Sequence, residues 1–144
     1  MKILLKKLRE NALMPMRGSA CAAGYDLYAC LEEPVVIRSG ETVKVGTGIS
    51  AAIPEGWFGA VFARSGLSLK EGLRPANCVG VCDSDYRGEY IVALHNDSGM
   101  DRTVTHGERI AQLVILPFLE AEFEFSEELP GTERGAGGFG STGK

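Results

Sequence analysis

The sequence places polar and charged side chains suited to a small anionic ligand in three separate segments of the chain. Residues 77–88 bring together the amide of Asn77, the carboxylate of Asp83 and the phenol ring of Tyr86. If this stretch forms a hairpin, the three groups surround one small pocket. If it forms an ordinary tight turn, its carboxylates bond to their own backbone or to water. A carboxylate able to act as a general base is available in either case.

Two further segments have the composition of phosphate-binding sites. Arg64-Ser65-Gly66 precedes a short predicted helix, where backbone N–H groups and an arginine can cradle an anion, although the triplet is also common in turns. The glycine-rich end supplies a bidentate phosphate ligand, an aromatic face for a base and two hydroxyl donors. These groups belong to Arg134, Phe139, Ser141 and Thr142. The alternative for this end is a solvated tail.

Two other kinds of site are not expected. Residues 138–144 match the spacing G-x-x-x-x-G-K of a P-loop, but that loop needs a following Ser or Thr and a helix, which the sequence does not supply after Lys144. The four cysteines lack the paired spacing of a zinc site. We expect Cys21, Cys30, Cys78 and Cys82 to be free thiols that pack as small buried apolar side chains.

Composition limits the partners and the compartment. The chain has 144 residues and a formal net charge of −4, which predicts one globular domain and argues against binding nucleic acid as a polymer. Lysines interrupt the apolar residues at the start, and no apolar run approaches the length of a membrane span. We therefore expect a cytoplasmic protein that does not bind a membrane.

The elements that must position these residues are short strands. Leu119, Ala121, Phe123 and Phe125 alternate with glutamates, which predicts a strand over 119–125. Turn signals separate further runs, a pattern typical of a sandwich, jelly roll or barrel. The other predicted strands are 3–8, 25–30, 35–37, 42–45, 49–53, 57–62, 90–94 and 110–116. Only residues 65–72 read as a helix, with Ser65 as its N-cap.

The composition changes near residue 130. Of the 19 glycines, six lie from Gly131 onward, where no strand pattern remains. We divide the chain into a β-barrel domain over 1–129 and an arm over 130–144. The residues at the glycine steps of the arm suggest a segment that becomes ordered around a ligand.

Five segments in this order resemble the motifs of the trimeric dUTP pyrophosphatase (dUTPase) family. They are residues 23–27, 64–67, 77–88, 107–112 and 134–143. The resemblance implies a jelly-roll-type β-barrel, a homotrimer with shared active sites, and hydrolysis of dUTP to dUMP and pyrophosphate. It implies Mg²⁺ as cofactor, and a role in supplying dUMP and limiting uracil incorporation into DNA.

The resemblance also implies a role for each matching residue. Asp83 matches the general base that activates a water for in-line attack on the α-phosphorus, and Tyr86 the ring that packs under the deoxyribose. Base and sugar contacts fall on Asn77, Gly80, Val81, Cys82, Tyr86, Ile91 and Phe139. Phosphate contacts fall on Arg64, Ser65, Gly66, Gln112, Arg134, Gly140, Ser141 and Thr142. Asp26 matches a position that reaches Mg²⁺ through water.

The arm, in the family, is mobile and closes over the base and γ-phosphate of a neighbouring subunit's site. Cys82 stands where Ile or Val is usual in the family, which affects at most the fine shape or redox sensitivity of the pocket. Two other functions remain compatible with the sequence. One is a dCTP deaminase or bifunctional deaminase–dUTPase of the same fold, and the other is a dUTP-sensing regulatory protein whose tail switches a partner surface.

Overall fold

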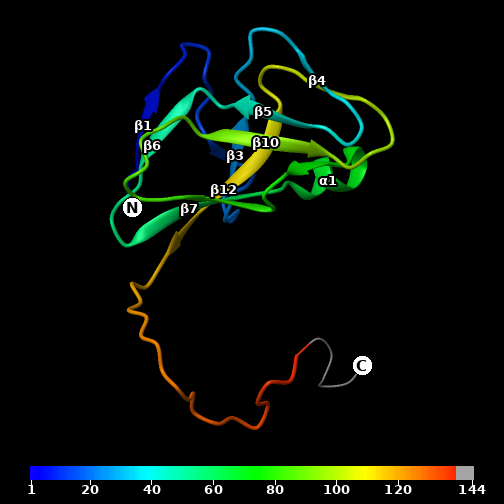
Figure 1. Ribbon diagram of the computed structural model, residues 1–144. Helices are drawn as coiled ribbons and strands as arrows, with labels where there is room; N and C mark the ends of the chain where they lie inside the picture. Colours follow the sequence, from blue (N-terminus) through cyan, green and yellow to red (C-terminus); the bar gives the residue numbers. More distant parts are fainter. Residues whose placement is uncertain (139–144) are drawn as a thin grey trace.

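The computed structural model describes residues 1–138 and has the all-β, jelly-roll-like fold that the sequence predicts (Figure 1). Within these residues, twelve strands and one helix follow each other along the chain. In order they are β1 (Leu4–Lys7), β2 (Met16–Arg17), β3 (Tyr25–Tyr28), β4 (Val35–Ile37), β5 (Thr42–Gly46), β6 (Ile49–Ala52), β7 (Trp57–Phe62), α1 (Ser65–Glu71), β8 (Leu73–Pro75), β9 (Val79–Cys82), β10 (Ile91–Asn96), β11 (Arg102–Val104) and β12 (Arg109–Pro117).

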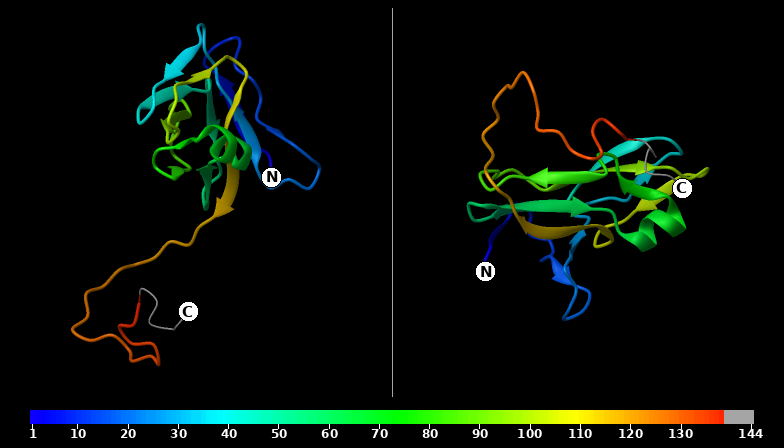
Figure 2. Two further views of the ribbon diagram at one scale, coloured as in Figure 1. Left: turned by 90° about the vertical axis from the view of Figure 1, so that its right-hand side faces the viewer. Right: turned by 90° about the horizontal axis from the view of Figure 1, so that it is seen from below.

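The largest sheet determines where the site residues lie. Its strands have the order β2-β3-β12-β7-β9, and every neighbouring pair is antiparallel. A second sheet has the order β5-β10-β8, while β1 with β6 and β4 with β11 form two-stranded ribbons. Figure 2 shows these strands stacked over one another, with α1 at one end of the stack.

The core lies between the sheets. Along β10 the buried side chains alternate, with Val92, Leu94 and Asn96 directed inward. Asn96 is completely buried, and its Nδ2 donates to the carbonyls of Ile37 and Met100, both at 2.9 Å. Because its polar atoms are satisfied, this asparagine ties β4 and the turn before β11 to the second sheet.

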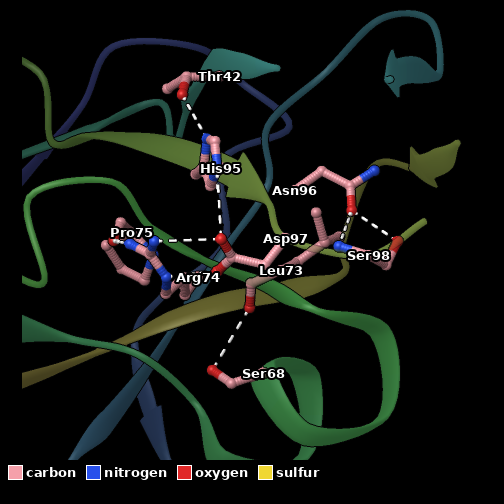
Figure 3. A network of polar contacts seen from close by, with 9 residues as sticks. All are labelled: Thr42, Ser68, Leu73, Arg74, Pro75, His95, Asn96, Asp97 and Ser98. Carbon is pink, nitrogen blue, oxygen red and sulfur yellow. Dashed lines mark hydrogen bonds and ion pairs between the residues drawn. The ribbon is translucent and has the colours of Figure 1, made fainter. Parts of the chain in front are cut away.

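A row of polar side chains fastens the second sheet from its other face (Figure 3). On β10, His95 lies opposite both Thr42 of β5 and Arg74 of β8. Its Nδ1 is 2.9 Å from the Thr42 hydroxyl oxygen, and its Nε2 is 3.3 Å from an Asp97 oxygen. Arg74 donates to both oxygens of the same carboxylate, at 2.5 and 3.2 Å. The side chains thus connect all three strands.

The helix is confirmed, but its predicted cap is wrong. Ser65 is the first residue of α1, and Arg64 occupies the N-cap position with no side-chain capping bond. An N-cap residue has extended backbone angles, and those of Arg64 are φ −93° and ψ 128°. At the other end Gly72 adopts φ 69°, a left-handed conformation that glycine reaches without steric cost.

The strand predicted over 119–125 is absent. This segment runs away from the barrel (Figure 1), and the side chains of Leu119, Phe123 and Phe125 are 94%, 93% and 105% exposed. Alternation marks a chain suited to a sheet, but a strand forms only when another strand satisfies its backbone groups. Within the described part of the chain, no strand lies beside this segment.

Four strands were not predicted from the sequence pattern because they are short. They are β2, β8, β9 and β11, of two to four residues each.

The expectation that the cysteines are buried holds for Cys30 and fails for Cys21 and Cys78, whose side chains are exposed. In residues 1–138 no helix has the length and apolar character needed to cross a membrane.

Candidate active site

β9 lies within the 77–88 segment and β10 follows it, and these two strands belong to different sheets. β9 pairs with β7 in the largest sheet, whereas β10 pairs with β5 and β8 in the second. Of the two possibilities that the sequence left open, a hairpin of β9 with β10 is not formed, because each strand pairs within its own sheet. Residues 83–90 cross from one sheet to the other, and the space between the two strands becomes a pocket.

This pocket has a volume of about 220 Å³. It is lined by every residue that the sequence assigned to a base and sugar site and that the structure describes. They are Asn77, Gly80, Val81, Cys82, Tyr86 and Ile91. Gly80 permits the close approach of neighbouring groups, since a Cβ there would lie 3.3 Å from Val61 and 3.4 Å from Asn77 Nδ2. The last base contact, Phe139, lies outside the described residues.

Asp83 follows β9 directly and is exposed to solvent. Its backbone carbonyl accepts the N–H of Tyr86 at 3.2 Å, which forms the turn. Within residues 1–138 its carboxylate makes no hydrogen bond or ion pair. A carboxylate in this state has free lone pairs to hold and deprotonate a water at the mouth of the pocket.

Tyr86 is held in place by its neighbours. Its hydroxyl donates to the Glu89 carbonyl at 2.9 Å, and its ring stacks on that of Tyr90, with centroids 6.2 Å apart and planes 27° apart. Gly88 is required beside it, because a Cβ at that position would overlap the Tyr86 hydroxyl. The ring keeps one face available, being 44% exposed.

Tyr90 was not among the predicted site residues. It is 2% exposed and lines the pocket beside Cys82. Burial raises the pKa of the Cys82 thiol, and interaction with Tyr90 opposes that rise. Burial, followed by the nearby Cys82, also raises the pKa of the Tyr90 phenol. In the sequence, a tyrosine at the start of an apolar strand reads as an ordinary core residue, so no signal marked it.

A second cluster of site residues lies on β3, β12 and the end of β7. Arg64 Nε donates to Asp26 Oδ1 at 2.8 Å, and Arg109 Nη1 donates to Asp26 Oδ2 at 3.3 Å. Gln112 Nε2 donates to the Ala63 carbonyl at 2.8 Å. Strand register explains the convergence, because Gln112 lies opposite both Asp26 and the last residue of β7. The cluster brings positive charge to one place around a single carboxylate.

The remaining phosphate-site predictions are only partly placed. Ser65 and Gly66 are exposed at the start of α1, directly after Arg64. Arg134 lies on the segment that leaves the barrel, where its Nε donates to the Gly137 carbonyl at 2.8 Å, so the structure does not bring it to the pocket. Gly140, Ser141 and Thr142 lie outside the described residues. Arg109, which no sequence argument singled out, joins the cluster.

The pocket and the cluster lie on opposite faces of the largest sheet. Leu27 and Val61 line the pocket, whereas the residues next to them, Asp26 and Phe62, point to the other face. A row of paired residues runs from Asp26 through Gln112 and Phe62 to Val79 on that outer face. With strands about 4.8 Å apart, the row spans about 14 Å.

The fold is a jelly-roll-like barrel. It carries a small pocket of amide, backbone and aromatic groups, and a separate arginine cluster. These features define an all-β protein suited to a small anionic ligand. Comparison with known proteins narrows the class. A dUTPase family model matches residues 10–143. A deoxyuridine 5'-triphosphate nucleotidohydrolase of Hydrogenobaculum sp. is 48% identical and covers 99% of both chains. One of Nautilia profundicola is 47% identical over the full length of both.

Solved structures agree. The Staphylococcus bacteriophage 80alpha dUTPase with dUPNHPP superposes with a TM-score of 0.90, at 32% identity over 99% of each chain. The dUTPase from phage phi11 of S. aureus gives 0.82 at 27% identity, covering 92% of this chain and 100% of its own. The chain belongs to the dUTPase family.

Membership of this family implies a divalent metal requirement. Within residues 1–138, no three His, Cys, Asp or Glu side chains gather as a metal site. The carboxylate nearest to the cluster, Asp26, already accepts hydrogen bonds from two arginines. These residues suit a metal that the substrate's phosphates carry and that the protein contacts through water, and they do not suit direct ligation by the chain.

Proposed function

We propose that this protein hydrolyses dUTP to dUMP and pyrophosphate, with the pocket between β9 and β10 holding the deoxyuridine. The observation that carries the proposal is the convergence of Asn77, the backbone of residues 80–82 and Tyr86 on one 220 Å³ pocket, with Asp83 directly after it. A space of this size suits a pyrimidine base and part of its sugar.

Base and sugar selection follow from the lining. The amide of Asn77 and the backbone groups of β9 can pair with the polar edge of uracil, and a closely fitted pocket rejects bases whose edge or size differs. The exposed face of the Tyr86 ring supports the deoxyribose. A ribose 2′-hydroxyl would collide with that ring, so dUTP is preferred over UTP.

Asp83 supplies the base. Its carboxylate takes a proton from a water molecule as the water oxygen attacks the α-phosphorus from the side opposite the leaving group. The bond from the α-phosphorus to the bridging oxygen breaks, and its electron pair leaves with pyrophosphate. The exposed position of Asp83, without an ion pair in the described chain, supports this role.

The phosphates are assigned to the arginine cluster and the adjoining turn. Arg64, Ser65, Gly66 and Gln112 donate to phosphate oxygens, and a substrate anion takes over the hydrogen bond that Arg64 Nε now makes to Asp26. We infer that the metal is Mg²⁺, which prefers oxygen ligands and keeps several waters. When bound, it neutralises charge on the phosphates. Asp26 contacts it through water.

The arm over 130–144 completes the site in this proposal. Phe139 stacks on the base, while Arg134, Gly140, Ser141 and Thr142 bind the γ-phosphate and exclude bulk water. The change in composition near residue 130 supports the division into a barrel domain over 1–129 and an arm. So does the departure of the chain from the barrel after β12.

We infer assembly as a homotrimer with shared sites, and the two faces of the largest sheet support sharing of sites between chains. A single substrate cannot contact the pocket on one face and the cluster on the other within one chain without passing around the sheet edge. Two chains that face each other remove this difficulty. The exposed apolar side chains of Leu119, Phe123 and Phe125 support burial between copies. The acidic net charge and the substrate fit a cytoplasmic enzyme that binds neither nucleic acid nor membrane.

The proposal is tested by measuring pyrophosphate release from dUTP, UTP, dTTP and dCTP in the presence of Mg²⁺. We expect efficient release from dUTP alone. Ammonia release from dCTP would assign a deaminase instead. Equal kcat/KM for dUTP and UTP, or efficient hydrolysis of dTTP, would contradict the assigned substrate.

A further inference from the structure

The Tyr90 hydroxyl is the one buried side-chain nitrogen or oxygen within residues 1–138 that has no hydrogen-bond partner. Its side chain lines the pocket between β9 and β10. Buried polar groups in folded proteins nearly always have a partner, because an unsatisfied hydroxyl costs folding free energy. A hydroxyl left without a partner at a pocket wall therefore indicates a group that a ligand satisfies.

Hydrogen bonds hold the main chain of Tyr90 next to β10. The Tyr90 N–H donates to the Ile49 carbonyl at 2.9 Å. Its carbonyl accepts both the N–H of Thr47 at 3.1 Å and the Thr47 hydroxyl at 2.6 Å. Thr47 is itself buried, so these bonds are protected from water. These bonds hold the main chain of Tyr90 at the pocket wall, and burial of its ring confines the side chain there.

The neighbours of the ring are themselves residues of the pocket. One face of Tyr90 stacks on Tyr86, at a centroid distance of 6.2 Å. Cys82, whose thiol is a weak hydrogen-bonding group, adjoins the hydroxyl and lines the same pocket. The local environment thus offers the hydroxyl only a poor internal partner, while its position is rigid before any ligand binds.

We propose that Tyr90 is a binding residue for the pyrimidine base, and that its hydroxyl forms its missing hydrogen bond with the polar edge of the base. This inference rests on the proposed function of the pocket. A phenol hydroxyl can donate to a base carbonyl and can accept from a ring N–H, so it matches either group on the edge of uracil. Tyr90 adds a side-chain contact to a pocket otherwise lined largely by backbone and apolar groups.

The test compares Tyr90→Phe with the wild type, because phenylalanine keeps the stacked ring and removes only the hydroxyl. We expect KM for dUTP to rise about 3- to 10-fold, the usual value of one hydrogen bond, with kcat within about twofold. The melting temperature of the ligand-free variant should equal or exceed that of the wild type, since an unsatisfied buried group is lost. Tyr28→Phe, on β3 and outside the pocket lining, is the matched control and should change neither quantity.

Two outcomes would overturn the proposal while leaving the proposed function intact. An unchanged KM with a lower melting temperature would show that the hydroxyl is bonded within the folded protein. An unchanged KM with an unchanged or higher melting temperature would show that the base does not use it. By contrast, a wild-type protein that releases no pyrophosphate from dUTP would refute the proposed function itself.

Discussion

At the scale of single residues, Asp83 is the clearest candidate for chemistry, because its carboxylate is exposed beside the pocket and bound to nothing in the described chain. Asp83→Asn keeps the size of the side chain and removes its basicity. We expect kcat for dUTP to fall by about 10²- to 10⁴-fold, the usual contribution of a general base, with dUTP binding retained. Steady-state pyrophosphate release and calorimetric titration with a non-hydrolysable dUTP analogue measure the two quantities.

The control for this variant is Glu55→Gln, which makes the same charge change on an exposed turn between β6 and β7. It should leave turnover unchanged. If purified Asp83→Asn also turned over at the wild-type rate, Asp83 would not be the base.

The partly buried Cys82 and the buried Tyr90 predict a loss of stability at alkaline pH. Burial raises the pKa of both groups, from ordinary values of 9.0 and 10.0. The unfolded chain therefore ionises first as pH rises, and the folded state loses free energy of unfolding above about pH 9. Below that pH both states are protonated, and the full stability is present.

Tyr90→Phe removes one of the two groups. Urea denaturation between pH 7 and 11 should show a smaller fall in the free energy of unfolding for this variant than for the wild type, with the difference appearing above pH 10. Parallel curves for the two proteins would mean that the Tyr90 phenol ionises equally well in the folded state.

At the scale of elements, the residue before β3 and the middle of β12 are in such close contact that a Cβ at position 24 requires Gln112 to move. A Cβ on Gly24 would overlap the side-chain amide of Gln112. Gly24→Ala should therefore displace Gln112 and break its 2.8 Å hydrogen bond to the Ala63 carbonyl, next to Arg64. We expect kcat/KM for dUTP to fall at least about tenfold, as misplacement of a phosphate-binding group does.

Gly18→Ala provides the comparison, because a Cβ at Gly18 meets no atom within 4 Å. It should leave kinetics and melting temperature unchanged. If the kinetics and melting temperature of Gly24→Ala were the same as those of Gly18→Ala, the contact with Gln112 would have no bearing on the phosphate site.

The elements also show how far the sequence could be read. Strands with several alternating or continuous apolar residues, such as β7, β10 and β12, fall where the pattern predicts them. β9 does not, because Val79-Gly80-Val81-Cys82 has no side chain that is fully buried. The alternation over 119–125 was read correctly as amphipathic and wrongly as a strand, since sequence periodicity does not report whether a pairing strand exists.

The candidate site divides in the same way. Local motifs identified the groups that line the pocket, because they lie within a few positions of one another. The arginine cluster depends on pairing between distant strands, and Arg109 reaches Asp26 across 83 positions. The resemblance assigned Asp26, Arg64 and Gln112 to the phosphate and metal site, but that Arg109 joins them could be read only from the fold. Tyr90 was missed because an unsatisfied hydroxyl is visible only when its surroundings are known.

At the scale of the whole molecule, the opposite faces of the largest sheet predict complementation between inactive chains. If the pocket of one chain works with the cluster of a neighbour, Asp83→Asn and Arg64→Ala chains should restore activity when they are unfolded and refolded together in equal amounts. A site then needs an intact Asp83 from one chain and an intact Arg64 from another. In a random assembly each of these two groups is intact with a chance of one half. Both are then intact in about one quarter of the sites, so we expect about one quarter of the wild-type activity.

The control mixture contains wild-type chains and chains that carry both substitutions. If sites are shared between chains, this mixture again has about one quarter of the wild-type activity. If each site lies within a single chain, this mixture has about one half of the wild-type activity and the first mixture has none. A tag on one parent verifies that mixed assemblies form. Mixed assemblies that stay inactive would place Asp83 and Arg64 of one working site in the same chain.

The central position of β12 has a consequence for how the protein is made. β12 is the last strand to leave the ribosome, yet it lies between β3 and β7 in the middle of the largest sheet. Until the chain has been synthesised to residue 117, β3 and β7 each have an unpaired edge. Unpaired strand edges are prone to aggregation and proteolysis. A chain stopped at residue 108 should accordingly be digested by a protease that spares the full protein. We therefore expect the largest sheet to be completed only after β12 has been synthesised.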